Sequence, residues 1–119
     1  MNKNKNIIAL ELIITYCDRI SGIRNSFNSN FDVFKSSHLY IDSIGMNILQ
    51  IGELTTQFTD DFKLKYTEIP WKAIKQMRNI FVHHYVTLDI NKLWNSIIKD
   101  IPILYEFCRK TLILLKNQE

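Results

Sequence analysis

The sequence has few of the residues that usually mark a phosphate loop or a zinc site. Of its 119 residues, three are glycine, two are proline and two are cysteine. The glycines stand singly, so there is no glycine-rich phosphate loop. Cys17 and Cys108 lie far apart without Cys-x-x-Cys or Cys/His spacing, and no acidic metal cluster is evident. We therefore predict buried, reduced thiols and neither a metal nor another cofactor.

Long apolar runs are also lacking. The run that follows the polar amino terminus is interrupted by Glu11, and Asp18 and Arg19 come soon after it. We find no signal peptide and no segment long enough to span a membrane, so we expect a cytoplasmic protein. Internal repeats and β-type alternation are absent as well.

Size and charge set outer limits on the function. A chain of 119 residues is expected to form one domain with a single core. It is 46% hydrophobic and 23% charged, which is typical of a globular protein. The net charge of +3 is compatible with a nucleic acid as partner, but it is too small to be diagnostic.

Apolar residues recur at intervals of three and four, which predicts an all-α fold. A first amphipathic helix is expected near the amino terminus, capped by Asn4 or Asn6. Gly22 and the Asn/Ser-rich run after it break the pattern, so residues 21–36 are predicted to form a loop. Three phenylalanines would anchor this loop or form a short turn of helix: Phe27, Phe31 and Phe34.

A second helix is predicted from Ser36 or Ser37 to about Asp60. Its apolar face is wide enough to contact more than one neighbour, which suggests a dimer. Gly45 and Gly52 lie on one side of it, seven residues apart, and favour close approach of another backbone. That neighbour is either part of the same chain or a second copy.

The rest of the chain predicts a polar connection over residues 59–69 and two further helices. Pro70 suits the first turn of the third helix, and Asp89 suits the cap of the fourth, in which Pro102 predicts a kink or a break. The buried stripe of the third helix is expected to comprise Trp71, Ile74, Arg78, Phe81, Val82 and Tyr85. Together the segments predict an up-and-down bundle of four or five helices.

The segment from Met77 to Tyr85 is the densest in groups that can do chemistry. Arg78 offers a planar fork of donors suited to phosphate, and His83 brings the type of side chain whose unperturbed pKa lies nearest neutral pH. On a straight helix these two side chains differ by about 140° around the axis. They therefore need a frayed helix end, a second helix or a second copy of the chain to form one site. Residue spacing also allows a purely structural reading.

Charged residues on the second and third predicted helices are candidates for supporting roles. Asp42 and Glu53, three helical turns apart, are placed to pair with Arg78 or to orient His83, or else they face solvent. Lys72 and Lys75 lead toward Arg78 and either steer phosphates or form a solvated face.

The spacing of Arg78, His83 and Tyr85, with a polar residue after the arginine, resembles the signature of the HepT-like branch of the HEPN superfamily. The similarity covers roughly residues 37–107 and is carried by these segments: Ile48–Leu54, Tyr66–Trp71, Met77–Tyr85, Asp89, Leu93–Trp94 and Asp100–Pro102. One departure is His84, which stands where relatives often have an acidic or small residue.

The resemblance implies a homodimer in which the motif helices of both copies line one cleft. It further implies metal-independent cleavage of RNA, with His83 as general base or acid and Arg78 stabilising the phosphoryl charge. Asn79 would hold the phosphate or fix the His83 tautomer. The role of His84 stays open.

The resemblance also implies that the chain is a toxin paired with a small nucleotidyltransferase antitoxin, which would transfer AMP to Tyr85. Two alternatives remain: a catalytically silent subunit that presents nucleotide or substrate to a nucleotidyltransferase, and a structural dimer module. The sequence does not identify the RNA target or the antitoxin.

Overall fold

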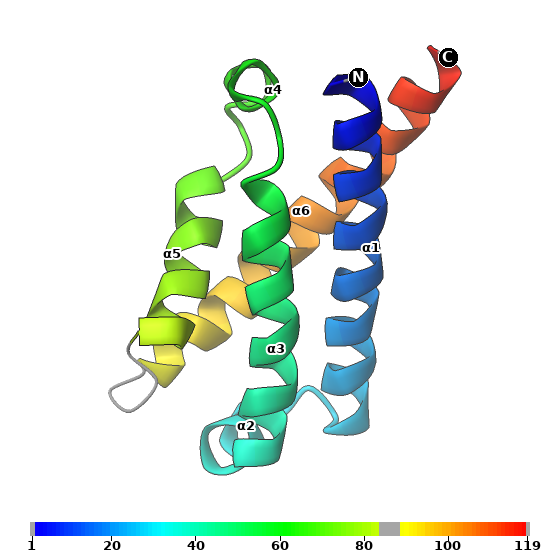
Figure 1. Ribbon diagram of the computed structural model, residues 1–119. Coiled ribbons are helices and arrows are strands. Elements are labelled where there is room, and N and C mark those ends of the chain that lie inside the picture. Colours follow the sequence, from blue (N-terminus) through cyan, green and yellow to red (C-terminus); the bar gives the residue numbers. More distant parts are fainter. Residues whose placement is uncertain (1, 84–88, 119) are drawn as a thin grey trace.

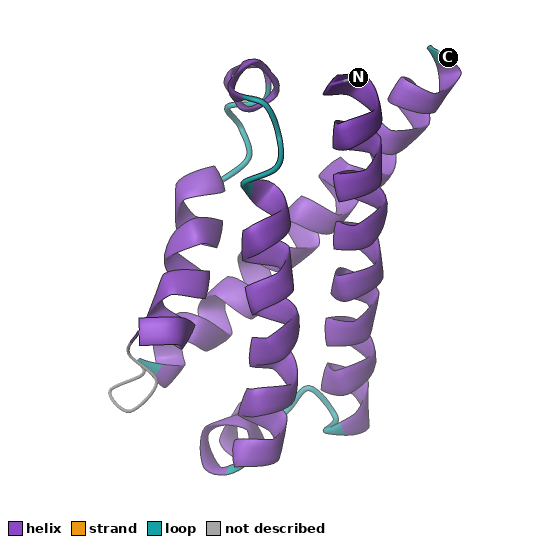
Figure 2. Ribbon diagram, in the orientation of Figure 1, coloured by secondary structure: helices purple, strands orange, loops and turns teal. Residues whose placement is uncertain are grey.

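The computed structural model describes residues 2–83 and 89–118, and the side chains of residues 5–82 and 89–118. Within these ranges all regular structure is helical (Figure 2). Four helices are long: α1 (Asn2–Ser26), α3 (His38–Thr55), α5 (Trp71–His83) and α6 (Ile90–Asn117). Two are short: α2 (Phe31–Ser36) and α4 (Asp60–Lys65). The predicted all-α bundle is confirmed.

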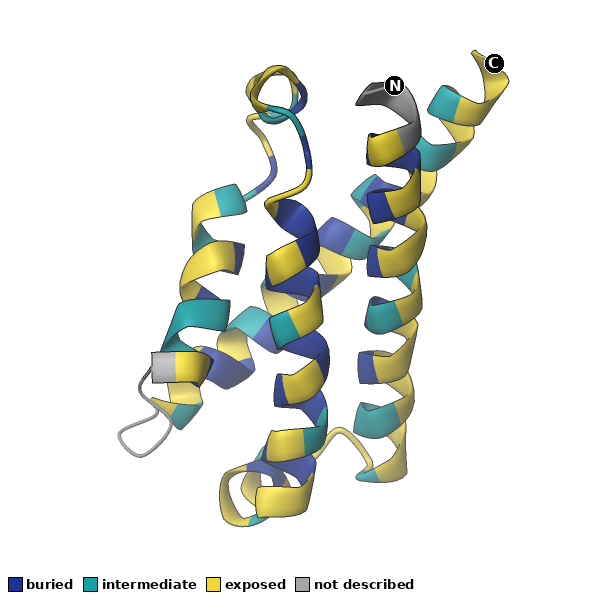
Figure 3. Cartoon of the chain, in the orientation of Figure 1, coloured by how far each residue is buried: buried dark blue, intermediate teal, exposed yellow. Residues whose placement is uncertain are grey.

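The long helices alternate in direction. In Figure 1, α1, α3 and α5 lie side by side, and α6 crosses behind them. Helix α3 packs against both α1 and α5, and α6 contacts α1 and α5. The central position of α3 explains why so much of it is buried (Figure 3). This arrangement fixes the contact between α3 and α5, at which Arg78 lies.

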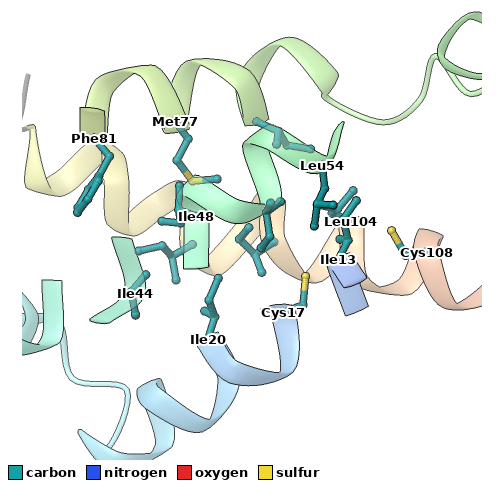
Figure 4. Packing of buried hydrophobic residues seen from close by; sticks show 14 of the residues in the cluster. Ile13, Cys17, Ile20, Ile44, Ile48, Leu54, Met77, Phe81, Leu104 and Cys108 are labelled. Carbon is teal, nitrogen blue, oxygen red and sulfur yellow. The ribbon is translucent and has the colours of Figure 1, made fainter. Parts of the chain in front are cut away.

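The core lies between the four long helices. Each contributes aliphatic residues at helical spacing, as Ile13, Ile48, Met77 and Leu104 illustrate (Figure 4). All four are buried. Because no single helix can bury its own apolar stripe, the association of these stripes stabilises the fold. Cys17 and Cys108 belong to the same core as free thiols, as predicted.

The first helix is longer than predicted, and residues 21–36 are not a loop throughout. Helix α1 begins at Asn2, ahead of the predicted caps, and continues through Gly22 to Ser26. It extends because Phe27, just past its end, stacks on Tyr40 with ring centroids 4.2 Å apart. The chain turns only at Asn28 and Ser29, whose φ angles are positive.

The phenylalanines of this segment do anchor it. Asn30 caps α2 by accepting a hydrogen bond from the Val33 N–H, and Phe34 is fully buried against the rings of Tyr40 and Trp94. The short turn of helix that the sequence allowed is therefore present.

The second predicted helix is shorter than expected, and a further short helix follows it. Ser37 caps α3 by accepting from the Tyr40 N–H, but α3 ends at Thr55, not near Asp60. The stretch predicted as a polar connection contains α4, whose cap is Thr59. Two acidic residues in its first turn complement the helix dipole, and Phe62 anchors the helix among Phe58, Tyr66, Trp71 and Phe107.

The last two helices begin close to where the sequence predicts. Helix α5 starts directly after Pro70, and the Asp89 carboxylate caps α6 by accepting from the Lys92 N–H. Helix α6 continues past Pro102 as one element, so the predicted alternative of two separate pieces is wrong. Pro102 is exposed on this helix, where it does not interrupt the packed core.

Candidate active site

The glycines of α3 set how closely α5 approaches. A Cβ added to Gly45 would come within 1.8 Å of the Phe81 ring, and one added to Gly52 within 2.5 Å of the Arg78 Cβ. Both neighbours are in α5 of the same chain. The close approach predicted for this glycine pair is therefore made within the chain, and it presses the stem of Arg78 onto α3.

Arg78 is held by two polar partners. Its guanidinium forms an ion pair with the Glu53 carboxylate on α3, and its Nη1 donates a hydrogen bond to the Asn79 Oδ1 at 2.9 Å. The Nε atom is buried and has no hydrogen-bond partner among the described residues. The side chain as a whole is 31% exposed, so Arg78 is only partly buried.

Glu53 is the acid that meets the arginine, which is one of the pairings the sequence allowed. It is 55% exposed, so the ion pair lies at the surface of the α3–α5 contact. Asp42 is exposed on the same helix, three turns earlier. The parts that Glu53, Asp42 and Asn79 play in any reaction stay predictions.

The remaining motif residues lie where the description of α5 stops. His83 is the last residue of α5 that the structure describes. The side chain of His83, and all of His84 and Tyr85, lie outside the described residues. Their predicted roles are therefore untested by the structure.

The buried stripe of α5 differs in part from the prediction. Ile74 and Phe81 are buried as expected, whereas Trp71 and Arg78 are only partly buried. Tyr85 lies outside the described residues, Val82 is 43% exposed, and Met77 is buried instead. The reason is that α5 has core neighbours on two sides, α3 and α6. Met77 belongs to the core between these helices, whereas Val82 lies outside both contacts.

A hollow lies beyond the Arg78–Glu53 pair, toward the start of α5. It has a volume of about 320 Å³ and is lined by Thr55, Thr56, Lys63, Trp71, Lys72 and Lys75. The sequence pattern indicates Lys72 and Lys75 as candidates for phosphate contacts but does not indicate Lys63. The reason is that Thr59-Asp60-Asp61 resembles the end of a helix. The same residues are an N-cap followed by an acidic first turn, which is the signal that could have found α4.

No group of three or more His, Cys, Asp or Glu side chains that could hold a metal ion occurs in the described part of the chain. Arg78 itself is a cation held beside an amide and a carboxylate. Such a group binds an anion, and a phosphate diester matches the geometry of its donor fork.

The model of the HepT-like family, described as ribonuclease HepT-like, matches residues 13–111. The chain belongs to this family. The match includes α3, α5 and most of α6, and with them Arg78, His83 and Tyr85. Family membership confirms the resemblance derived from the Arg/His/Tyr spacing and its flanks.

Individual relatives agree with the family model. The chain is 39% identical over 54 residues to "Probable ribonuclease HepT" of Thermococcus cleftensis, a match that covers 45% of this chain and 49% of the relative. It is 28% identical over 99 residues to a protein of Caldanaerobacter subterraneus that is provisionally named an RNase, covering 80% and 83%.

A third relative is larger than this chain. A Methanocaldococcus jannaschii protein, named a gamma-glutamylcyclotransferase and provisionally an RNase, is 36% identical over 75 residues. The match covers 63% of this chain and 34% of that relative. The chain thus spans about a third of the length of this relative and about half of the length of the Thermococcus cleftensis relative. No solved structure matches it.

Within residues 2–83 and 89–118, no helix combines the length and the apolar character that crossing a membrane requires.

Proposed function

We propose that this HepT-like protein is a metal-independent endoribonuclease. The observation that carries the proposal is Arg78, which has the spacing of the family signature and is held at the α3–α5 contact with a side chain that is 31% exposed. A fixed cation of this kind stabilises charge that develops on a phosphate without the cost of reorganising at the moment of reaction.

In the proposed reaction a ribose 2′-hydroxyl attacks the adjacent phosphorus atom. His83 takes the proton of that hydroxyl, and a proton donor protonates the departing 5′-oxygen as its bond to phosphorus breaks. Arg78 stabilises the extra negative charge on the phosphoryl oxygens. The products are a 2′,3′-cyclic phosphate and a 5′-hydroxyl, and no metal ion takes part.

The site is proposed to be completed by a second copy of the chain. Positions 78 and 83 of a straight helix differ by about 140° around its axis, so Arg78 of one copy is suited to act with His83 of the other. Three large apolar side chains on α3 and α5 support such an interface, because they are strongly exposed: Leu39 (69%), Met46 (59%) and Val82 (43%).

Val82 follows Phe81, which packs on Gly45, and Met46 follows Gly45 on the facing helix. Each of these two side chains is rotated by about 100° around its helix from the preceding residue, which lies at the contact. Because α3 and α5 run in opposite directions, the two rotations bring Met46 and Val82 to the same outer face. A homodimer through this face would bring the two copies of Arg78 and His83 near one another.

The biological role we propose is that of a toxin in a type II toxin–antitoxin pair, with a nucleotidyltransferase as antitoxin. Transfer of AMP to the Tyr85 hydroxyl would add bulk and negative charge next to the motif, and repulsion would exclude RNA. Co-expression with the antitoxin, followed by mass spectrometry, tests this. An AMP group on wild type and none on Tyr85→Phe is expected; an unmodified wild type would contradict the proposal.

Cleavage is tested with wild type and His83→Ala on tRNA and mRNA in excess EDTA, with analysis of the fragment ends. His38→Ala is the matched control, since His38 is an exposed histidine outside the motif. We expect cleavage with cyclic phosphate ends by wild type and His38→Ala only. Absence of cleavage by unmodified wild type would favour a catalytically silent subunit, and unfolding of His83→Ala would favour a structural role.

The shared site is tested by mixing Arg78→Ala with His83→Ala. Each variant alone is expected to be inactive, and mixed dimers should recover part of the activity because one of their two sites has both residues. A mixture without activity would contradict the composite site.

Met46→Glu should dissociate the dimer and abolish cleavage. Leu64→Glu should do neither, because Leu64 is also strongly exposed (72%) but lies on α4.

A further inference from the structure

The lysine-lined hollow at the start of α5 has the composition of an anion site. Three segments meet there: the end of α3 contributes Thr55 and Thr56, α4 contributes Lys63, and α5 contributes Trp71, Lys72 and Lys75. Its volume of about 320 Å³ falls within the range of small-ligand pockets. Three of the six lining residues are cations, and the described residues place no carboxylate in the lining.

The positive charge of the hollow is not neutralised within the described part of the chain. None of its three lysines forms an ion pair with a described residue, whereas Lys35, Arg78 and Lys116 each do. The hollow also lies at the amino-terminal end of α5, where the helix dipole adds partial positive charge. Unpaired cations in a concave surface attract a polyanion over several ångströms.

The floor of the hollow is rigid. The Trp71 Nε1 donates to the Tyr66 carbonyl oxygen at 3.0 Å, and the Trp71 ring packs against Phe58 and Phe107. The hydroxyls of Thr55 and Thr56 donate to the carbonyl oxygens of Gly52 and Glu53. Since these donors are already used, the lysine ammonium groups are the donors left for an incoming anion.

Along α5, the two lysines that this helix contributes to the hollow lie within two helical turns of Arg78. Lys75 precedes Arg78 by three residues and Lys72 by six, which places them about 4.5 Å and 9 Å further along the axis of α5. On α3, Thr55 and Thr56 follow Gly52, which contacts Arg78, by about one turn. In duplex DNA each strand advances about 3.4 Å per phosphate, and even at this short spacing a strand crossing Arg78 reaches the hollow within about three nucleotides.

We propose that the hollow formed by Lys63, Lys72 and Lys75 binds the phosphate backbone of single-stranded RNA, one to three nucleotides from the phosphate held by Arg78. This inference rests on the proposed ribonuclease function. The lysines hold the strand in register and contribute affinity, and they take no part in bond cleavage. Because they contact phosphates rather than bases, the site is indifferent to base sequence.

The test compares two triple variants that lose the same charge. Lys63, Lys72 and Lys75 are replaced by Gln in one, and the exposed Lys5, Lys99 and Lys110 of α1 and α6 in the other. Both are made in the His83→Ala protein, and the Kd for a single-stranded RNA is measured by fluorescence anisotropy in EDTA at several salt concentrations. Circular dichroism establishes that each variant is folded.

We expect the hollow variant to bind RNA at least tenfold more weakly and the control variant to bind like the parent. Each lost phosphate contact lowers the slope of log K against log salt by about 0.7, so three lost contacts lower it by about 2. With His83 present, the hollow variant should show a raised KM and an unchanged cleavage rate at saturating RNA.

The outcomes separate this inference from the proposed function. Lysine-dependent binding by a wild type that cleaves no RNA supports the hollow and contradicts the ribonuclease. Equal affinities and salt slopes for the two triple variants overturn the hollow, even where wild type cleaves RNA. A loss of the saturated rate in the hollow variant would also overturn it, because a backbone site does not act in the chemical step.

Discussion

Gly52 lies directly against the stem of Arg78, because a Cβ at position 52 would come within 2.5 Å of the Arg78 Cβ. Absence of a side chain at this one position of α3 therefore determines where the guanidinium of α5 stands. Gly22, in contrast, lies in α1 with open space where its Cβ would be. The two glycines thus form a matched pair for mutation.

Gly52→Ala is expected to destabilise the protein relative to Gly22→Ala. Both substitutions gain helix propensity, but only the first forces Arg78 and α5 to move, at a cost of about 1–3 kcal/mol. Urea unfolding of both variants measures the difference. Gly52→Ala should also lower RNA cleavage by displacing Arg78. Equal stability of the two variants would contradict the close contact.

Glu53→Gln is expected to leave stability nearly unchanged and to tighten RNA binding. The Arg78–Glu53 pair is at the surface, where such pairs contribute at most about 1 kcal/mol. Gln removes a negative charge that competes with phosphate for the guanidinium. Anisotropy titration should give a lower Kd than for Glu106→Gln, an exposed change on α6. A higher Kd would mean that the charge of Glu53 is needed to orient Arg78.

Phe62→Ala is expected to destabilise the protein by about 3 kcal/mol. Phe62 is 7% exposed and contacts the rings of Phe58 at 4.6 Å and Tyr66 at 4.9 Å, so its removal leaves a cavity under α4. Leu64→Ala on the same helix should change stability by less than about 0.5 kcal/mol, since Leu64 is 72% exposed. Comparable losses from both would contradict the anchoring of α4 by its aromatic residue.

Stability is expected to fall in alkaline solution. Burial, with a smaller contribution from Asp18, raises the pKa of the Cys17 thiol from 9.0 to about 12, and burial also raises the pKa of Cys108. A thiol with a raised native pKa keeps its proton while the unfolded chain loses it. The free energy of unfolding is therefore unaffected by these thiols well below pH 9 and decreases as the pH rises above 9.

Urea unfolding at pH 8 and pH 10 measures this effect, with the Cys17→Ala/Cys108→Ala double variant as control. Wild type should lose more stability than the variant between the two values. Native thiols should also react slowly with a thiol reagent at pH 8 and rapidly in urea. Fast reaction of the native protein would contradict their burial.

The sequence by itself determined the helical class and much of where the helices begin. Periodic apolar residues act through neighbours within a turn or two of helix, and so do the residues at helix starts, Ser37, Pro70 and Asp89. Their effect can therefore be predicted from the local sequence. Family-specific spacing likewise identified Arg78, because a motif within one helix needs no knowledge of the other helices. The helix break that was expected at Gly22 is absent, because Phe27 stacks on Tyr40, a residue outside the helix and distant in the sequence.

Tertiary structure decided which surfaces meet. Periodicity shows that a helix has an apolar face, but it does not show which helix that face will contact or at what height. The pairing of Glu53 with Arg78, the contact of both glycines with α5, and the meeting of Lys63 with Lys72 and Lys75 all depend on how α3, α4 and α5 pack. These relationships join residues far apart in the chain, and only the packing of the core brings them together.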